Sequence, residues 1–464
     1  MTRPLRVAVV GSGPAGVYAS DALMKSSTDV EVDLFEKMPA PFGLIRYGVA
    51  PDHPRIKGII KALHRVMDKP QLRLFSNVEF GKDITLEEMK DLYDAVIFAT
   101  GAVGDRALPV PGADMPEHFG AGEFVGFYDG NPLFERSWDL SAESVAVIGV
   151  GNVGLDVSRI LAKTGEELHV TEIPDNVYEA LKTNKATEVH VFGRRGPAQA
   201  KFTPLELKEL DYSPNVEVIV NPEDIEYDSS SEIARRESKI TDQVCTILEN
   251  YAIREPKNAP HKLYIHFFES PVEILGEEGP DGVQHITGLR TQRMEYDGAG
   301  GVRPTGKTTD WNVGAVYSAV GYRSDALPGI PFDEVKHVIS NVGGRVIDSE
   351  TTGDEDAQAI TGLYTTGWVR RGPVGLIGNT KGDANEAVAN LLADAAEGKK
   401  FSPSKPELAA VDELLRAKGV DFLDWDGWHA LDAAEHAAGE AEGRERKKYV
   451  EWADMVAHSK GAQG

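Results

Sequence analysis

The 464-residue chain contains one cysteine, Cys245, and this scarcity excludes several kinds of redox site. An internal disulfide, a Cys-x-x-Cys pair and an iron–sulfur cluster held by cysteines all need more thiols. Any redox chemistry must therefore use a bound organic group. Because Cys245 lies in a helical pattern over residues 240–251, we expect its thiol to be buried and unreactive.

Long apolar runs and excess positive charge are also missing. No run approaches the roughly 20 apolar residues that span a membrane, and the N-terminal residues lead directly into a strand pattern. These features predict a cytoplasmic protein without a membrane partner, although an organellar protein trimmed of its presequence would have the same sequence. The net charge of −25 disfavours a nucleic-acid partner, because phosphates would be repelled. We also expect no metal site.

A glycine-rich turn, residues 11–16, follows an apolar strand pattern and precedes a helical one. In a dinucleotide-binding unit, the first glycine permits the tight turn, the second lets a pyrophosphate approach, and the third lets helix and strand pack closely. The next strand pattern, residues 30–35, ends at Glu36, 20 residues after the last glycine. A carboxylate at this place binds ribose hydroxyls. The sequence therefore predicts a dinucleotide site that includes Gly11, Gly13, Gly16 and Glu36.

The same pattern recurs from residue 144, where a strand precedes the glycines of residues 149–154. Its partner strand, residues 188–192, leads to Arg194 and Arg195, which stand where the first unit has its acid. Two guanidinium groups favour a 2′-phosphate, because they form bidentate charge-assisted hydrogen bonds. We therefore predict NADP in this unit. About 40 residues rather than ~20 separate the glycines from the arginines, and we expect an elongated helix plus an insertion over residues 161–186, of unknown function.

Strand patterns over residues 94–100 and 314–320 each run into a glycine, as expected where a dinucleotide-binding domain ends. The predicted fold class is therefore α/β, with two Rossmann-like dinucleotide-binding domains, one inserted into the other. The first domain resumes after about residue 331.

Several longer motifs resemble those of the adrenodoxin-reductase-type ferredoxin–NADP reductases. They are residues 41–54 (PFGLIRYGVAPDHP), 149–156, 193–197 and 367–378 (GWVRRGPVGLIG). The likeness covers essentially the whole chain, including the insertion and the C-terminal residues 425–448. The resemblance implies an FAD-binding domain at residues 1–108 and 331–464, the latter with a C-terminal helical extension, and an NADP-binding domain at residues 109–330.

The resemblance also implies particular contacts. For FAD these are Ala15, Glu36, Leu44, Phe80, Trp368, Gly375, Leu376 and Ile377. Gly101 is predicted to bind the cofactor from its place at the end of the strand pattern over residues 94–100. For NADP they are Arg106, Gly151, Asn152, Val153, Arg194, Arg195, Glu206 and Gly375, which the two ligands share. The chain departs from the family at Gly154, where alanine is usual, and in the order of residues 378–380, so no contact is assigned to Asn379.

The implied chemistry is transfer of a hydride from NADPH to FAD and of single electrons to a small iron–sulfur protein. His53 is a candidate for handling protons at the flavin, and a structural or docking role fits equally. Glu209 shares a helix face with Glu206 and is a candidate beside the nicotinamide, or a solvated glutamate. Trp368 covers the flavin or nicotinamide, or packs in a core.

Basic side chains offer a docking surface for an acidic ferredoxin, because complementary patches steer encounter even between proteins of like net charge. One group lies on a helical face over residues 54–67 and a second lies near residue 235; a solvated surface is the alternative. They are Arg55, Lys57, Lys61 and Arg65, and Arg235, Arg236 and Lys239.

Three other functions stay open. A diaphorase would reduce quinones or oxygen from NADPH without a protein acceptor. An electron-input subunit of the glutamate-synthase kind normally carries the cluster-binding cysteines that are missing here. A redox-sensing module would use FAD and NADP only to set its conformation.

Overall fold

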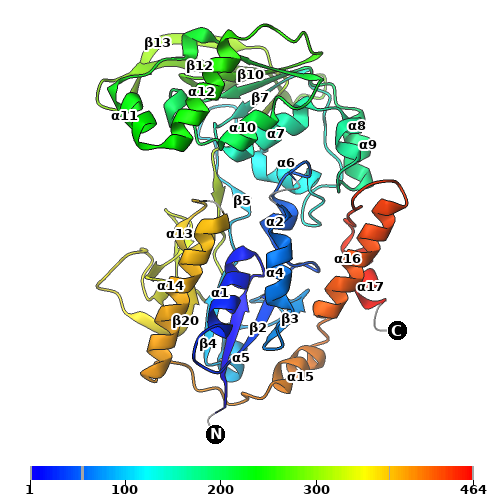
Figure 1. Cartoon of the computed structure of the whole chain (residues 1–464), viewed down its shortest axis with the longest axis vertical. Helices are drawn as coiled ribbons and strands as arrows, with labels where there is room; N and C mark the ends of the chain where they lie inside the picture. The colour runs from blue at the N-terminus through cyan, green and yellow to red at the C-terminus, as the bar shows by residue number, and fades with distance from the viewer. Residues whose placement is uncertain (1–2, 54–56, 376, 462–464) are drawn as a thin grey trace. The chain divides into compact units, whose positions relative to one another are not determined.

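The computed structural model describes residues 3–53, 57–375 and 377–461, and the chain divides into two compact units (Figure 1). Unit 1 comprises residues 1–104 and 322–464, and unit 2 comprises residues 105–321. These breaks lie four residues before the expected limit at 108 and nine residues before the expected limit at 330. The cofactor that each range binds stays a prediction.

Unit 1 is built on a seven-stranded sheet in the order β18-β19-β20-β4-β1-β2-β3. The strands from β20 to β3 are parallel, and β19 and β18 add an antiparallel edge. The strands are β1 Leu5–Val10, β2 Val30–Glu36, β3 Leu72–Ser76, β4 Ala95–Phe98, β18 Asn341–Val342, β19 Arg345–Ile347 and β20 Ala359–Thr365. The helices are α1 Pro14–Met24, α2 Leu44–Tyr47, α4 Ile60–Met67, α5 Leu86–Leu92, α13 Trp368–Arg371, α14 Ile377–Ala396, α15 Ala409–Ala417, α16 Trp425–Glu440 and α17 Trp452–Lys460.

The side chains of β1 enter two different cores, which explains why its sequence is apolar throughout. Val7 and Val9 pack in the cluster that includes residues of α1 and α14. Ala8 and Val10 pack in the cluster on the other face. A strand buried on both faces is typical of a parallel sheet covered by helices on both sides. The sheet therefore fixes the position of the glycine turn that follows β1.

Unit 2 repeats this architecture with a six-stranded parallel sheet in the order β6-β14-β7-β8-β10-β9. A separate antiparallel sheet of three strands, β11 Glu269–Glu278, β12 Gln284–Tyr296 and β13 Val302–Trp311, belongs to the same unit. The parallel strands are β6 His118–Gly120, β7 Ser144–Ile148, β8 Glu188–Phe192, β9 Val216–Val220, β10 His261–His266 and β14 Ala315–Ser318. The helices are α6 Ala121–Tyr128, α7 Asn152–Ala162, α8 Gly165–His169, α9 Asp175–Lys182, α10 Pro204–Glu209, α11 Ser229–Glu237 and α12 Lys239–Ile253.

The expected burial of Cys245 is confirmed. Its side chain is fully buried on α12, and burial raises the pKa of the thiol above its ordinary value. A thiolate is the reactive form of cysteine. Cys245 therefore acts as a small apolar core residue.

Two helical expectations are wrong. The helix before the insertion is not elongated, because α7 ends at Ala162 and Lys163 has extended backbone (φ −77°, ψ 156°). Thr164 and Glu167 then form a capping box that begins α8. The basic segment before residue 67 is not one continuous helix either, since a turn at residues 58 and 59 precedes α4, as the low helix propensity of glycine explains. Within the described ranges, no helix is both long and apolar enough to cross a membrane.

Candidate dinucleotide sites

In the glycine turn of unit 1, packing leaves no room for a side chain at the first and third glycines. The glycine between them borders open space. A Cβ on Gly11 would lie 2.4 Å from the carbonyl oxygen of Ala99, and one on Gly16 would lie 1.8 Å from that of Gly11. A Cβ on Gly13 would meet no atom within 4 Å. Gly13 is also the N-cap of α1, and no side chain caps this helix. Space at an uncapped helix start is what a pyrophosphate requires.

The glycine turn of unit 2 has the same design. A Cβ on Gly149 would lie 2.3 Å from the carbonyl oxygen of Ala319, and one on Gly154 would lie 2.4 Å from that of Gly149. A Cβ on Gly151 would meet no atom within 4 Å. Gly151 is the N-cap of α7, which again has no side-chain cap and no acid in its first turn. That turn contains the predicted contact residues Asn152 and Val153.

The chemistry at the end of the second strand differs between the units. In unit 1, the buried Glu36 carboxylate accepts hydrogen bonds from the Ser12 amide (3.0 Å) and hydroxyl (2.6 Å) and from the Met38 amide (2.9 Å). Burial raises the pKa of Glu36, and these hydrogen bonds oppose the rise. In unit 2, Arg194 and Arg195 are exposed, and neither guanidinium bonds to any described residue. Unit 1 thus offers a hydroxyl acceptor and unit 2 offers two cations.

The predicted motif over residues 41–54 reaches the glycine turn of unit 1. The Phe42 amide donates to the carbonyl oxygen of Ser12 at 3.2 Å. A Cβ on Gly43 would lie 3.2 Å from the Cα of Gly13, and Gly43 has a φ of +50°, which glycine adopts readily. This glycine permits the close approach that places Leu44, the first residue of α2, beside the turn.

A second predicted motif reaches the same turn, and a residue that the sequence analysis missed holds it. A Cβ on Gly367 would lie 2.6 Å from the Cβ of Ala15 in α1. The buried Asp383 on α14 accepts from the Gly367 amide at 2.5 Å and also pairs with Arg370. Trp368 follows directly, so the structure brings it to the turn as well. No local pattern marks Asp383, because its partners are set by tertiary packing.

The remaining residues predicted for unit 1 have mixed surroundings. Phe80 is buried and packs edge-to-face against Phe98. Gly101, just after β4, has a φ of +75° and open space where a Cβ would lie. Gly375 is exposed with a φ of +88°. His53 is 3% exposed, Ile377 begins α14, and Leu376 lies outside the described residues.

The other residues predicted for unit 2 gather partly at the start of α7. Asn152 accepts a hydrogen bond through Oδ1 from the Thr203 amide at 2.8 Å. Thr203 is the N-cap of α10, which contains the buried Glu206 and the half-buried Glu209. The α7–α10 contact therefore brings Asn152 near these two glutamates in space. Arg106 is exposed, and its amide donates to Gly321 at 2.9 Å.

The first group of predicted docking residues is only partly exposed. Lys61 and Arg65 are exposed on α4, and neither side chain has an ion pair with a described residue. Lys57 is half-buried. Arg55 lies outside the described residues.

The second group is divided by its ion pairs. Arg235 pairs with Asp242 at 3.0 Å and with Glu249 at 2.6 Å, and its side chain is only 18% exposed. Arg236 and Lys239 are exposed. Arg235 is therefore committed to stabilising its own unit, and Arg236 and Lys239 are the accessible cations of this group.

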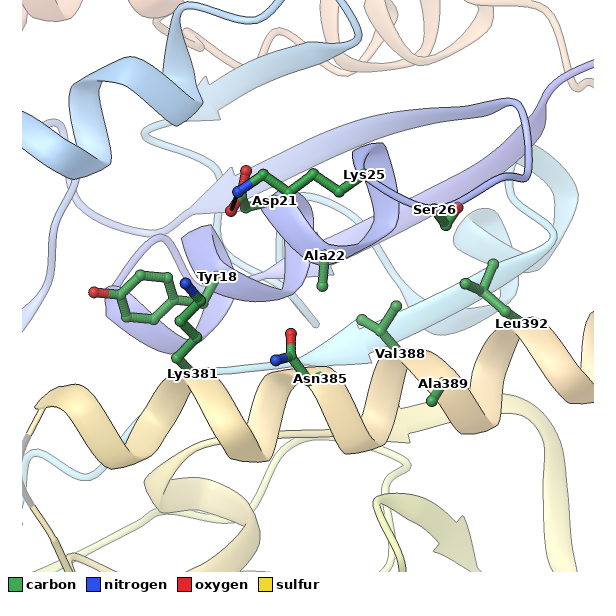
Figure 2. A pocket seen from close by; sticks show the side chains of 10 residues that line it. All are labelled: Tyr18, Asp21, Ala22, Lys25, Ser26, Lys381, Asn385, Val388, Ala389 and Leu392. Carbon is green, nitrogen blue, oxygen red and sulfur yellow. Dashed lines mark hydrogen bonds and ion pairs between the residues drawn. The ribbon is translucent and has the colours of Figure 1, made fainter.

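A groove lies between α1 and α14 in unit 1 (Figure 2). Asp21 on its wall pairs with Lys25 at 2.6 Å. None of the described residues predicted for a cofactor lines this groove. Its lining residues are Tyr18, Asp21, Ala22, Lys25, Ser26, Lys381, Asn385, Val388, Ala389 and Leu392.

Comparisons with known proteins agree with this geometry. The family model described as pyridine nucleotide-disulphide oxidoreductase matches residues 5–191. The chain is 38% identical to NADPH-ferredoxin reductase FprA of Mycobacterium tuberculosis, over 98% of this chain and 99% of that protein. It is 36% identical to mitochondrial NADPH:adrenodoxin oxidoreductase of Bos taurus, over 97% and 91% of the two chains.

The solved structure of Mycobacterium tuberculosis FprA in complex with NADPH is also similar, with a TM-score of 0.89 and 37% identity over 98% of this chain and 100% of that one. Identity at this level over nearly full length confirms the predicted α/β fold class with two Rossmann-like domains. It also confirms the resemblance found in the sequence motifs. The chain belongs to the family of the NADPH-ferredoxin and NADPH:adrenodoxin reductases.

Proposed function

We propose that this protein is an FAD enzyme that oxidises NADPH and reduces a ferredoxin-like iron–sulfur protein. The observation that carries the proposal is the pair of open glycine turns with opposite chemistry beside them: the Glu36 carboxylate in unit 1 and the Arg194–Arg195 pair in unit 2. Bound FAD supplies the conversion of a two-electron hydride donor into single electrons. The names of the relatives, NADPH-ferredoxin reductase and NADPH:adrenodoxin oxidoreductase, support the identity of donor and acceptor.

In this proposal unit 1 holds FAD. The open space at Gly13 admits the pyrophosphate, and the remaining acceptor capacity of Glu36 serves ribose hydroxyls. Leu44 and Trp368, which packing brings to the same turn, close over the ligand. The 20-residue α14 presents the positive end of its dipole at Ile377, where it stabilises negative charge. The further proposed FAD residues are Gly11, Ala15, Gly16, Phe80, Gly101, Gly375 and Leu376.

Unit 2 holds NADPH in this proposal, with Arg194 and Arg195 on the 2′-phosphate. Replacing Arg194 by alanine removes a charge-assisted hydrogen bond to a group that NADH lacks. We expect the KM for NADPH to rise about 30-fold and that for NADH to change less than about twofold. An equal rise in the KM for both dinucleotides would show that Arg194 does not bind the 2′-phosphate. The further proposed NADPH residues are Arg106, Gly151, Asn152, Val153, Glu206 and Gly375.

We also propose chemical roles for two side chains. The buried His53 handles protons at the flavin, and Glu209 on α10 orients the nicotinamide amide. The variant His53→Gln keeps a hydrogen-bonding side chain of similar size without a titrating group. We expect it to flatten the pH profile of kcat between about pH 6 and 8. An unchanged profile would leave His53 with a structural role only.

The accessible cations of α4 support docking of an acidic partner in this proposal. Reversing both charges, Lys61→Glu with Arg65→Glu, is expected to slow ferredoxin-dependent turnover at low salt and to leave ferricyanide reduction unchanged. Reversing two other exposed lysines of unit 1, Lys82 and Lys399, makes the same change in net charge. Equal losses in the two double variants would place the effect in net charge rather than in α4.

The function is tested most directly by NADPH-dependent reduction of cytochrome c with and without added ferredoxin, at low and high salt. Strong stimulation by ferredoxin that weakens with salt supports the proposal, because exposed charges are screened. Rapid turnover that ignores ferredoxin would favour a diaphorase that reduces quinones or oxygen. A cytoplasmic location is part of the proposal and is tested by fractionation of the source cells.

A further inference from the structure

Lys201 lies beside the open glycine turn of unit 2. An isolated parallel β-bridge pairs it with Gly151, and its amide donates to the carbonyl oxygen of Val150 at 2.8 Å. Backbones paired in this way lie about 4.8 Å apart. The backbone of Lys201 is therefore a direct neighbour of the glycine at the start of α7.

The bridge also fixes the direction of the Lys201 side chain. Residues paired across neighbouring strands place their side chains on the same side, and successive residues alternate. Phe202, the next residue, is 3% exposed and points into the core, whereas Lys201 is exposed. Lys201 therefore projects on the side where a Cβ on Gly151 would meet no atom within 4 Å.

Positive charge gathers here at Lys201 and at the start of α7, while the carboxylate of Glu206 on α10, near the same end of the helix, is buried. The Lys201 side chain has no hydrogen bond or ion pair with any residue in the described part of the chain. The start of α7 has no side-chain cap and no acid in its first turn, and the next acid along the helix, Asp156, pairs with Arg159 at 2.9 Å. An ammonium group beside the positive end of a helix is favourable only when an anion lies between them.

We propose that Lys201 binds the pyrophosphate of the nicotinamide dinucleotide, as a third cation beside Arg194 and Arg195. This inference rests on the proposed NADPH site of unit 2 and gives its three cations two different roles. The two arginines recognise the 2′-phosphate that distinguishes NADPH from NADH. Lys201 recognises the pyrophosphate that both dinucleotides share, and so sets affinity without setting specificity.

The test measures binding rather than turnover, by isothermal titration calorimetry of the purified flavoprotein with NADP⁺, NAD⁺ and 2′-AMP. The variant Lys201→Met keeps the apolar stem and removes the charge. We expect its Kd for NADP⁺ and for NAD⁺ to rise about tenfold, and its Kd for 2′-AMP, which has no pyrophosphate, to stay within about twofold. Lys201→Arg is expected to restore the affinity for NADP⁺.

Two further variants test whether the effect is specific to Lys201. Arg194→Ala is expected to show the reverse pattern, weakening NADP⁺ and 2′-AMP but not NAD⁺. Lys307→Met removes another exposed charge, on β13 of the same unit, and is expected to change none of the three constants. The inference is overturned if Lys201→Met leaves NADP⁺ binding unchanged or weakens 2′-AMP as strongly as NADP⁺. Failure of the wild-type protein to bind NADP⁺ would instead overturn the proposed function.

Discussion

A buried ion-pair network joins α16, in the C-terminal extension of unit 1, to α2, the helix of the proposed flavin motif. Glu435 is fully buried, and its carboxylate accepts from Arg46 (2.9 Å to Oε2), from Arg446 (2.9 Å) and from the Tyr449 amide (3.0 Å). Arg46 is 3% exposed. Burial lowers the pKa of its guanidinium, but the Glu435 charge beside it outweighs burial and leaves that pKa well above its ordinary value. In addition, Lys448 donates to the carbonyl oxygen of Arg46 at 2.7 Å.

The variant Glu435→Gln tests what this network contributes. The amide keeps the shape of the side chain but removes the one negative charge that both guanidinium groups share. Breaking a buried pair by removing one partner costs about 3–5 kcal/mol, because a buried charge is left uncompensated. Arg446 keeps its pair with Asp432, so the uncompensated charge is mainly that of Arg46. We therefore expect a loss of about 3 kcal/mol, a large part of the roughly 5–15 kcal/mol that stabilises a typical protein.

The loss is measured by urea unfolding of the FAD-loaded protein, followed by the increase in flavin fluorescence on release. Only the transition that releases FAD is compared, since a two-unit chain need not unfold in one step. Asp421→Asn is the matched control, because it removes an ion pair with Lys460 in which both side chains are about half exposed; it is expected to cost less than about 0.5 kcal/mol. If Glu435→Gln costs no more than this control, the reasoning about buried charge is refuted.

Three further predictions follow from the site and the core. Gly13→Ala is expected to fold but to lose FAD affinity, because its Cβ would enter only the open space. Gly16→Ala is expected to unfold unit 1, because its Cβ would meet a backbone oxygen at 1.8 Å. Flavin content and circular dichroism distinguish the two variants. Burial lowers the pKa of His266 to about 3, so the unfolded chain binds a proton that the folded chain does not. The free energy of unfolding of the protein should therefore fall by up to about 1.4 kcal/mol per pH unit below pH 6.5. Urea unfolding between pH 7.0 and 5.5 measures this dependence, and a weaker dependence on pH in His266→Gln would confirm that His266 causes it. Cys245 should react with a thiol reagent only when unit 2 opens, and rapid labelling of the native protein would contradict its burial.

The parts of the fold that depend on local rules were predicted well from the sequence. The strand over residues 30–35 corresponds to β2, and the burial of Cys245 followed from its helical pattern. The insertion was predicted less well, although the signal was present. Thr164 and Glu167 have the spacing of a capping box, and they begin a new helix where one long helix was expected.

Tertiary partners escaped the sequence analysis because nothing local marks them. Arg46 and Glu435 are 389 positions apart, and Asp383 reaches Gly367 from a different helix. A buried carboxylate of this kind has the same local sequence as a solvated one. The motif over residues 41–54 was recognised by resemblance alone, and its contact with Ser12 and Gly13 became visible only in the structure.

The cofactor sites could be predicted from the sequence more fully than the docking surface, and the reason is again whether local backbone geometry or tertiary contacts define the site. At the glycine turns, backbone geometry decides: the first and third glycines are fixed by contacts with carbonyl oxygens of the unit itself, so only the open glycine between them is left for a ligand. A docking cation is defined by what it does not contact, which a sequence does not record. Arg235 and Arg236 are neighbours in sequence, yet one is committed to Asp242 and Glu249 while the other is exposed. For an enzyme of this kind, the sequence therefore predicts the cofactors better than it predicts the surface that binds the protein partner.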